Sequence, residues 1–205
     1  MKRLALVVAG LLLVGCAAVP TGTPTTPSGS SPTTAPSAGA TASGPTDLLA
    51  MRRAAGIADC PSSTATAAAG GLPDVTLTCL GGGSTVRLAG LRGPMLVNLW
   101  AQWCYPCRAE SAHLAAFAST SKTVHVLGVD FADPQPELAI QFAQLTAMTY
   151  PHVTDPDGAT RIGLGISGIP ASFLIDAKGA IVARHVGAFG SLESVQEWVR
   201  DGLGS

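Results

Sequence analysis

A pair of cysteines directly after a buried strand is the feature that most constrains how this chain can fold. Residues 95–100 are apolar except for Asn98, as is typical of a strand that is buried on both faces. Cys104-Tyr105-Pro106-Cys107 follows, and residues 108–119 have helical spacing with Leu114 and Phe117 inward. A strand, a Cys-x-x-Cys motif and a helix in this order predict an α/β sheet with a redox site at the end of the strand.

The position of Cys104 at the start of a helix explains why thiol–disulfide exchange needs two cysteines at this spacing. The thiolate is the attacking species, and the free N–H groups and positive dipole of a helix N-terminus stabilise it. We therefore expect Cys104 to be the exposed nucleophile that attacks a disulfide. Cys107 lies one turn further on the same face, more buried and within disulfide reach, and would resolve the mixed disulfide. Pro106 suits the first helical turn, where its missing N–H costs little.

The rest of the pattern predicts further strands and helices around this unit. Strands are expected at residues 75–78, 85–88, 124–129, 171–175 and 181–186. A helix is expected over residues 136–148, with Leu138, Phe142 and Leu145 on one side. A closing helix is expected over residues 191–203, carrying Leu192, Val195 and either Trp198 or Val199 inward. This order predicts a mixed central sheet flanked by helices.

The N-terminus indicates export. Lys2 and Arg3 precede an uncharged apolar run over residues 4–14, which is too short for a membrane span of about 20 residues and is typical of a secretory signal peptide. Leu13-Val14-Gly15-Cys16 resembles the lipobox of bacterial lipoproteins, which implies that residues 1–15 are removed and that Cys16 is lipidated. An ordinary signal peptide that happens to contain a cysteine is the alternative. Two or more acyl chains anchor a protein stably, so we expect the mature chain at the outer face of the cell membrane.

A low-complexity segment separates this anchor from the remainder of the chain. Residues 17–46 are Ala, Gly, Pro, Ser or Thr apart from Val19, a composition that predicts a disordered stalk over residues 16–46. Residues 47–205 have the length of one domain with a single core. The formal net charge of −1 and the lack of a basic stripe argue against a nucleic-acid partner.

The number of cysteines predicts how the remaining thiols are paired. With Cys16 assigned to the lipid, four cysteines remain, an even number in an oxidising compartment. Cys104 and Cys107 form one pair, so Cys60 and Cys79 are expected to form a structural disulfide. Two independent buried thiols are one alternative, and a zinc site built from all four cysteines is another. Zinc would require a second Cys-x-x-Cys or a histidine pair at ligand spacing, which the scattered histidines do not provide, so no metal is predicted.

Two segments carry a resemblance to a known family. Ala101-Gln102-Trp103-Cys104-Tyr105-Pro106-Cys107-Arg108 resembles the thioredoxin superfamily active site, and Gly168-Ile169-Pro170 resembles its cis-proline loop. Within the superfamily, the chain is most similar to the extracytoplasmic, membrane-tethered TlpA/ResA/DsbE-like branch. Asn98 stands where cytosolic thioredoxins carry a buried aspartate, Glu110 matches the active-site glutamate of the branch, and residues 134–155 match its inserted helix and strand. The resemblance covers residue 72 to the C-terminus.

The resemblance implies a fold and a site. The fold would be a thioredoxin fold with an inserted helix–strand unit, and Pro170 would be cis. The substrate groove would be formed by Trp103, Tyr105, Pro106, Ile169 and Pro170. Glu110 would transfer a proton to or from Cys107, although an acid in a first helical turn is also favoured by the helix dipole alone. Trp103 could equally be a packing residue. Tyr105 departs from the Pro or Glu usual in the branch, which leaves the redox potential open.

The resemblance also implies an activity, with alternatives. The chain would be a thiol–disulfide oxidoreductase that acts on extracytoplasmic proteins without a cofactor. It would reduce, for example, apocytochrome c cysteines, with electrons from a membrane thiol carrier. An oxidase that installs disulfides in secreted proteins remains an alternative. A thiol peroxidase would need a lone cysteine in a Thr-x-x-Cys setting, which Cys104 does not have, because Ala101 stands three residues before it. A metallochaperone of this superfamily would resemble Cys-x-x-x-Cys, so the two-residue gap argues against it.

Overall fold

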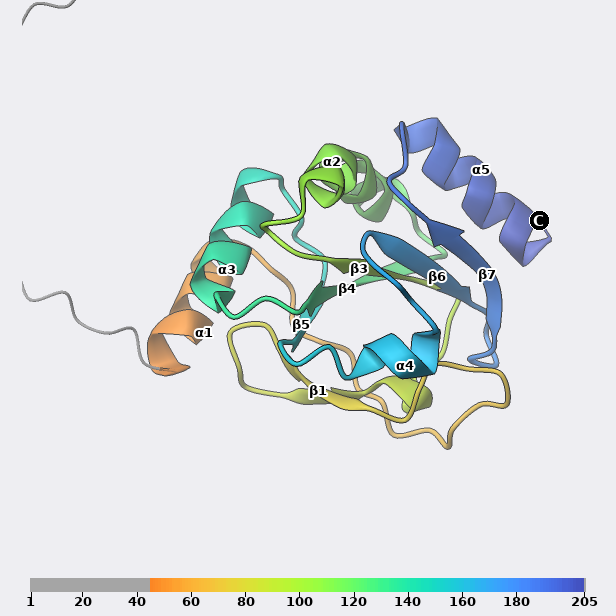
Figure 1. The fold of residues 1–205 in the computed structure, drawn as a ribbon, viewed down its shortest axis with the longest axis horizontal. Helices are drawn as coiled ribbons and strands as arrows, with labels where there is room; N and C mark the ends of the chain where they lie inside the picture. The colour runs from red at the N-terminus through yellow and green to blue at the C-terminus, as the bar shows by residue number, and fades with distance from the viewer. Residues whose placement is uncertain (1–44, 205) are drawn as a thin grey trace, which may run out of the picture. The chain divides into compact units, whose positions relative to one another are not determined.

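The computed structural model describes residues 45–204 (Figure 1). The strands are β1 (Thr76–Cys79), β2 (Thr85–Arg87), β3 (Met95–Trp100), β4 (His125–Phe131), β5 (His152–Asp155), β6 (Ala171–Ile175) and β7 (Ile181–Val186). The helices are α1 (Pro45–Ala54), α2 (Tyr105–Thr120), α3 (Pro136–Leu145), α4 (Thr160–Leu164) and α5 (Leu192–Leu203), with a short 3₁₀ helix, η1, at Leu88–Gly90. The predicted leader, the lipidation site Cys16 and nearly all of the predicted stalk lie outside the described residues.

The strands form one mixed seven-stranded sheet in the order β2-β1-β5-β4-β3-β6-β7. The three neighbours β3, β4 and β5 run parallel, and the remaining pairs are antiparallel. The unit formed by α3 and β5 is inserted between β4 and the β6–β7 hairpin. This is a thioredoxin-like fold with an added helix and strand, so the predicted fold class is confirmed. None of the helices in residues 45–204 has the length and hydropathy needed to cross a membrane.

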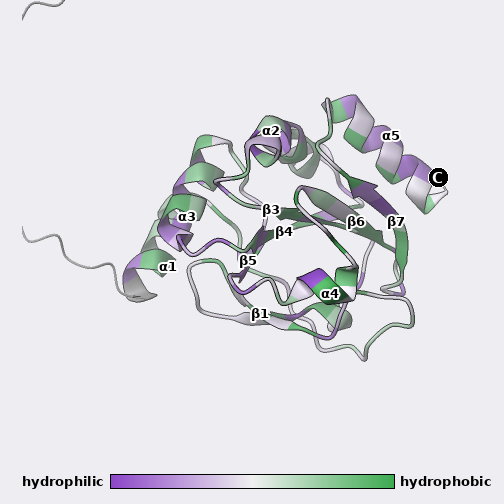
Figure 2. Cartoon of the chain, in the orientation of Figure 1, coloured by the Kyte–Doolittle hydropathy of each residue, from purple (hydrophilic) through white to green (hydrophobic). Residues whose placement is uncertain are grey.

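Strand β3 is buried on both faces, as its apolar run predicts. Leu96 and Trp100 pack on one face with α2, α3 and α5, whereas Val97 and Leu99 pack on the other face with η1 and α4. All six residues of β3 are buried. The colouring in Figure 2 shows this hydrophobic centre, while α5 presents hydrophilic residues as well as hydrophobic ones. The strand that leads into the cysteine motif is therefore held rigidly from both sides.

Helix α3 differs from its prediction. It ends at Leu145 rather than at residue 148, and its buried residues are Ala139, Ile140, Phe142 and Ala143. Leu138 is 40% exposed and Leu145 is 85% exposed, so the predicted face was wrong for both leucines. The helix packs against α1 and presents two alanines to the core, and small side chains allow such a close approach. Neither α1 nor the short helix α4 was predicted from the sequence.

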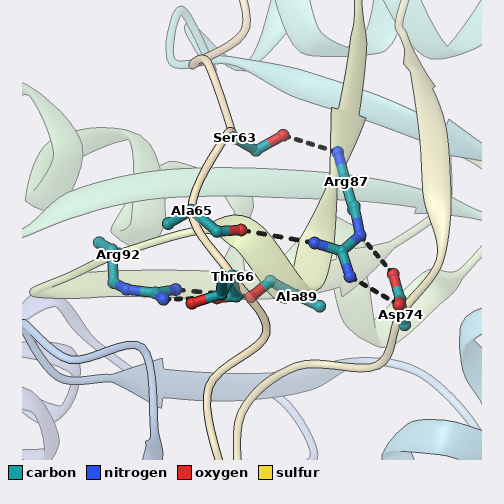
Figure 3. Close-up of polar contacts among 7 residues, drawn as sticks. All are labelled: Ser63, Ala65, Thr66, Asp74, Arg87, Ala89 and Arg92. Atoms are coloured by element: carbon teal, nitrogen blue, oxygen red, sulfur yellow. Dashed lines mark hydrogen bonds and ion pairs between the residues drawn. The ribbon is translucent and has the colours of Figure 1, made fainter.

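Two arginines attach the N-terminal extension to the sheet (Figure 3). The Arg87 guanidinium pairs with both carboxylate oxygens of Asp74, at 2.6 and 2.7 Å, and also donates to the Ala65 carbonyl oxygen at 3.4 Å. The backbone N–H of Arg87 donates to Ser63 Oγ at 2.7 Å, and Arg92 Nη2 donates to the Thr66 carbonyl oxygen. We call residues 63–66 the anchored segment. Its contacts are made largely through backbone atoms.

Candidate active site

The Cys-x-x-Cys motif lies at the start of α2, as predicted. Cys104 is the N-cap residue of this helix, and its Sγ accepts the backbone N–H of Cys107 at 3.2 Å. The two cysteines form a disulfide with their Cα atoms 5.3 Å apart. Pro106 lies in the first turn. The free N–H groups of the helix start therefore face the sulfur of Cys104, where they would stabilise a thiolate.

The predicted exposure of Cys104 is wrong for this oxidised form. Cys104 is only 4% exposed and Cys107 is 1% exposed. The reason is that Sγ of Cys104 is turned back over the first helical turn, where it is bonded to Cys107 and accepts its N–H. The neighbours Trp103 and Tyr105 are 53% and 83% exposed. A partner therefore meets these two rings first, and Cys104 remains the less buried of the two sulfur-bearing residues.

The backbone of Gln102 is held at both its N–H and its carbonyl oxygen, contacts that were not predicted from the sequence. Its N–H donates to Asp133 Oδ2 at 3.4 Å, and its carbonyl oxygen accepts from Arg108 Nη1 at 3.2 Å. The Arg108 guanidinium also lies 5.1 Å from the centre of the Phe142 ring. These contacts fix the loop between β3 and Cys104. No sequence signal identifies Asp133, because it reaches the loop only through the pairing of β3 with β4.

The Ile169–Pro170 peptide bond is cis, as the resemblance implies. The pairing of Ala171 with Leu99 places the start of β6 next to the end of β3. Pro170 therefore lies near the cysteine motif. Its carbonyl oxygen accepts the N–H of Gly187 at 3.0 Å, and Ile169 packs against the core cluster that contains both cysteines.

Glu110 is buried on the same face of α2 as Cys107, one turn further on, and is 1% exposed. Its Oε1 accepts from Asn98 Nδ2 at 2.9 Å, and its Oε2 accepts from the Phe189 N–H at 3.0 Å. Asn98 also donates to Ser172 Oγ at 3.1 Å. Burial raises the pKa of Glu110 to about 7, against the lowering effect of the hydrogen bonds from Phe189 and Asn98. A carboxyl with this pKa can bind or release a proton near neutral pH.

A second buried carboxyl lies at the end of β4. Asp130 pairs with Trp100 in the sheet register, is fully buried, and has no hydrogen-bond partner at either carboxyl oxygen. Burial and, to a lesser extent, the neighbouring Asp133 carboxyl raise the pKa of Asp130 to about 8. At neutral pH the protonated form of Asp130 therefore predominates. Asp130 was not among the predicted site residues.

Comparison with known proteins identifies the family. The AhpC/TSA family pattern matches residues 70–184, which is more than half of the chain. The chain belongs to the AhpC/TSA family. This AhpC/TSA-family chain is 36% identical over 116 residues to the thiol:disulfide interchange protein DsbE of Pseudomonas fluorescens biotype C, covering 56% of the chain and 64% of that protein. It spans between half and just under two thirds of the curated relatives it matches.

Solved structures of the same kind are also similar to this AhpC/TSA-family chain. A putative thiol:disulfide interchange protein DsbE from Chlorobium tepidum is 27% identical, with a TM-score of 0.58 over 68% of this chain and 100% of that chain. A DsbF homologue from Corynebacterium diphtheriae is 25% identical, with a TM-score of 0.57 over 65% of this chain and 86% of that chain. The resemblance to the DsbE-like branch is thereby confirmed. Within residues 45–204, no group of three or more His, Cys, Asp or Glu side chains is placed to bind a metal ion.

Proposed function

We propose that the chain is a thiol–disulfide oxidoreductase that acts on extracytoplasmic proteins through Cys104 and Cys107. The observation that carries this proposal is the disulfide at the N-terminus of α2, with the N–H of Cys107 directed at Sγ of Cys104. The similarity to DsbE-like proteins supports the same activity. Trp103, Tyr105 and Pro106 on one side, and Ile169 and Pro170 on the other, would form the groove that receives the substrate chain.

The proposed reaction starts from the reduced protein. The Cys104 thiolate attacks a substrate disulfide, forms a mixed disulfide and releases one substrate thiolate. The Cys107 thiolate then attacks Sγ of Cys104, which closes the Cys104–Cys107 disulfide and releases the second substrate thiolate. The substrate gains two electrons and the protein loses two. An external dithiol must then reduce the protein again, and the resemblance suggests a membrane thiol carrier.

Glu110 is proposed to accept the proton of the Cys107 thiol when Cys107 becomes the attacking group. With a pKa of about 7, this carboxyl is partly ionised at neutral pH and can accept a proton without a large cost. We expect Glu110→Gln to slow the exchange step by about tenfold or more at pH 7–8, and to remove the inflection near pH 7 from the rate profile. Stopped-flow Trp fluorescence, which follows reduction of a model disulfide between pH 5 and pH 9, would measure both effects.

The matched control for this experiment is Glu197→Gln on α5. Glu197 is exposed, so its substitution removes the same charge without altering the site. Glu110 is the sixth residue of α2, so the alternative role of a first-turn acid was wrong. A rate profile that keeps its inflection in Glu110→Gln would limit Glu110 to its buried hydrogen bonds with Asn98 and Phe189.

The direction of electron flow is proposed to be reductive, as for apocytochrome c cysteines before haem attachment. The residues between the cysteines, Tyr105 and Pro106, include no histidine that would stabilise the reduced form. Stabilisation of the reduced form moves the potential of strong oxidants toward about −120 mV, whereas thioredoxin lies near about −270 mV. We expect a potential below about −200 mV for Cys104–Cys107. The lipid anchor at Cys16 would keep the domain at the outer membrane face, near a membrane carrier.

Equilibration with glutathione redox buffers, followed by alkylation and peptide mass analysis of Cys104 and Cys107, measures this potential. A value near that of the strong oxidants would instead assign the chain to the installation of disulfides in secreted proteins. That outcome would leave the exchange chemistry of Cys104 in place.

A further inference from the structure

The environment of the Cys60–Cys79 disulfide differs from that of an ordinary structural bridge. The bridge joins the N-terminal extension to β1, with its Cα atoms 6.0 Å apart. The guanidinium of Arg52 on α1, a residue only 3% exposed, donates from Nη1 to Sγ of Cys79 at 2.9 Å. The same nitrogen donates to the Gly82 carbonyl oxygen at 3.1 Å. A positive charge is therefore buried against one sulfur of the bridge.

The counterion of Arg52 offsets this charge only in part. Arg52 Nη2 pairs with Asp59, but the Asp59 side chain is 88% exposed, and water weakens such an ion pair. A disulfide sulfur is a weak hydrogen-bond acceptor, whereas a thiolate is an anion and accepts a charge-assisted hydrogen bond. The contact would therefore be much stronger with a Cys79 thiolate than with the disulfide.

The other sulfur also has a partner that suits the reduced state. Sγ of Cys60 lies 3.1 Å from the backbone carbonyl oxygen of His152. The disulfide has no hydrogen to donate at this contact, but a Cys60 thiol does. The same carbonyl already accepts the Leu80 N–H at 2.8 Å, which leaves its second lone pair for the thiol. Both products of reduction, a Cys79 thiolate and a Cys60 thiol, thus have hydrogen-bond partners in place.

Access to the two sulfurs is unequal. Cys79 is 1% exposed, whereas Cys60 is only partly buried. The residues on either side of Cys60, Asp59 and Pro61, line an open cleft of about 410 Å³ that reaches Met95 and Val124. Cys60 itself does not line this cleft, but it is the more exposed of the two cysteines. We therefore expect an attacking thiolate to reach Cys60, with the buried Cys79 as the leaving group.

We propose that Cys60–Cys79 is a second redox-active pair, which is reduced by a thiol donor that attacks Cys60. A donor thiolate forms a bond to Sγ of Cys60, the Cys60–Cys79 bond breaks, and Cys79 leaves as a thiolate paired with Arg52. A second donor thiolate then attacks the donor sulfur of the mixed disulfide, so that the donor becomes a disulfide and Cys60 takes up a proton. Two electrons pass from the donor to the pair. Because stabilisation of the reduced form raises a reduction potential, Arg52 makes this bridge easier to reduce.

We expect the N-terminal extension to stay attached to the domain when the disulfide is reduced. Arg87 and Arg92 hold the anchored segment, a few residues after Cys60, independently of the disulfide (Figure 3). The proposal does not depend on the activity of Cys104 and Cys107, so the two sites can be tested separately.

The test uses the full chain with Cys104→Ser and Cys107→Ser, so that one redox pair remains in residues 45–204. The protein is equilibrated with glutathione buffers of increasing reducing strength, and Cys60 and Cys79 are quantified by alkylation and peptide mass mapping. We expect reversible reduction of the pair in the folded protein, with a glutathione mixed disulfide on Cys60 and none on Cys79. Reduced thioredoxin in place of glutathione is the second arm, which distinguishes a protein dithiol from a small thiol. Reduction in either arm supports the proposal, and resistance in both overturns it.

Arg52→Gln tests the role of the buried charge. We expect the equilibrium constant for reduction by glutathione to fall by about tenfold, which corresponds to about 30 mV for a two-electron couple. Arg53→Gln is the matched control, because Arg53 is the exposed neighbour on α1 and its substitution should leave the constant unchanged. Arg52→Lys keeps the charge and should recover part of the loss. An unchanged constant in Arg52→Gln, or glutathione attached to Cys79 in the protein with Arg52 intact, would overturn the proposal. The mapping with Arg52 intact needs no arginine variant to fold.

Discussion

Replacement of Cys107 by serine is expected to leave Cys104 covalently joined to its protein partners. The first step of exchange needs only the Cys104 thiolate, whereas release of the partner needs Cys107. Cys104→Ser should form no such adducts. Both variants should lose multiple-turnover activity by on the order of 10³-fold or more, because each removes one of the two sulfurs that must react in every cycle. Non-reducing gels and mass spectrometry of partners captured from the extracytoplasmic fraction would measure the trapping.

The experiment is informative because both cysteines are buried to a similar degree. The exposed fractions of the two cysteines are 4% and 1% in the oxidised form, so exposure alone separates them weakly. The N–H of Cys107 directed at Sγ of Cys104 is the stronger reason for the assignment. Adducts in Cys104→Ser and none in Cys107→Ser would reverse the roles of the two cysteines. Cys60 and Cys79 are present in both variants, so adducts that form only at Cys60 are identified by peptide mapping.

The second large effect concerns stability and Asp130. Its pKa is about 8 in the folded protein, against an ordinary value of 3.8. A carboxyl with a raised pKa stabilises the fold below its unfolded pKa, and this contribution is lost as the pH rises through its folded pKa. From pH 5 to pH 9 the loss from Asp130 would be about 4 kcal/mol. We expect Asp130→Asn to remove most of this dependence from the free energy of unfolding, measured by urea denaturation across that range.

Asp157→Asn serves as the control for this measurement. Asp157 is exposed in the turn before α4, so its substitution should leave the pH dependence as it is. Glu110, whose pKa is about 7, contributes in the same direction and accounts for the dependence that Asp130→Asn leaves. If the pH dependence of the Asp130→Asn protein equals that of the unmodified protein, Asp130 is ionised in the folded state at neutral pH.

The central elements of the fold could be predicted because their signals are local. Strand β3 and the β6–β7 hairpin have the predicted bounds, since a continuous apolar run and a short turn each leave a direct pattern in the sequence. The start of α2 is marked by Cys104 and Pro106 in the same way. Helical spacing predicted α3 but placed the wrong face of that helix inward. The resemblance to the DsbE-like branch supplied the inserted strand, β5.

The missed features depend on contacts between distant parts of the chain. The pairing of β3 with β4 brings Asp130 and Asp133 to the loop before Cys104, and only folding joins Arg52 to Cys79. The burial of Cys104 depends on the disulfide and on the first turn of α2, which residue type does not reveal. In α3, small alanines replace leucines at the packed positions because the neighbouring helix lies close.

The anchored segment has a consequence for sequence variation. Arg87 and Arg92 contact the carbonyl oxygens of Ala65 and Thr66, which every amino acid provides. The attachment of the anchored segment to Arg87 and Arg92 therefore does not depend on which side chains stand at positions 65 and 66. Related chains could diverge there, and a fluorescent or spin label could be introduced there, while the path of the backbone is retained.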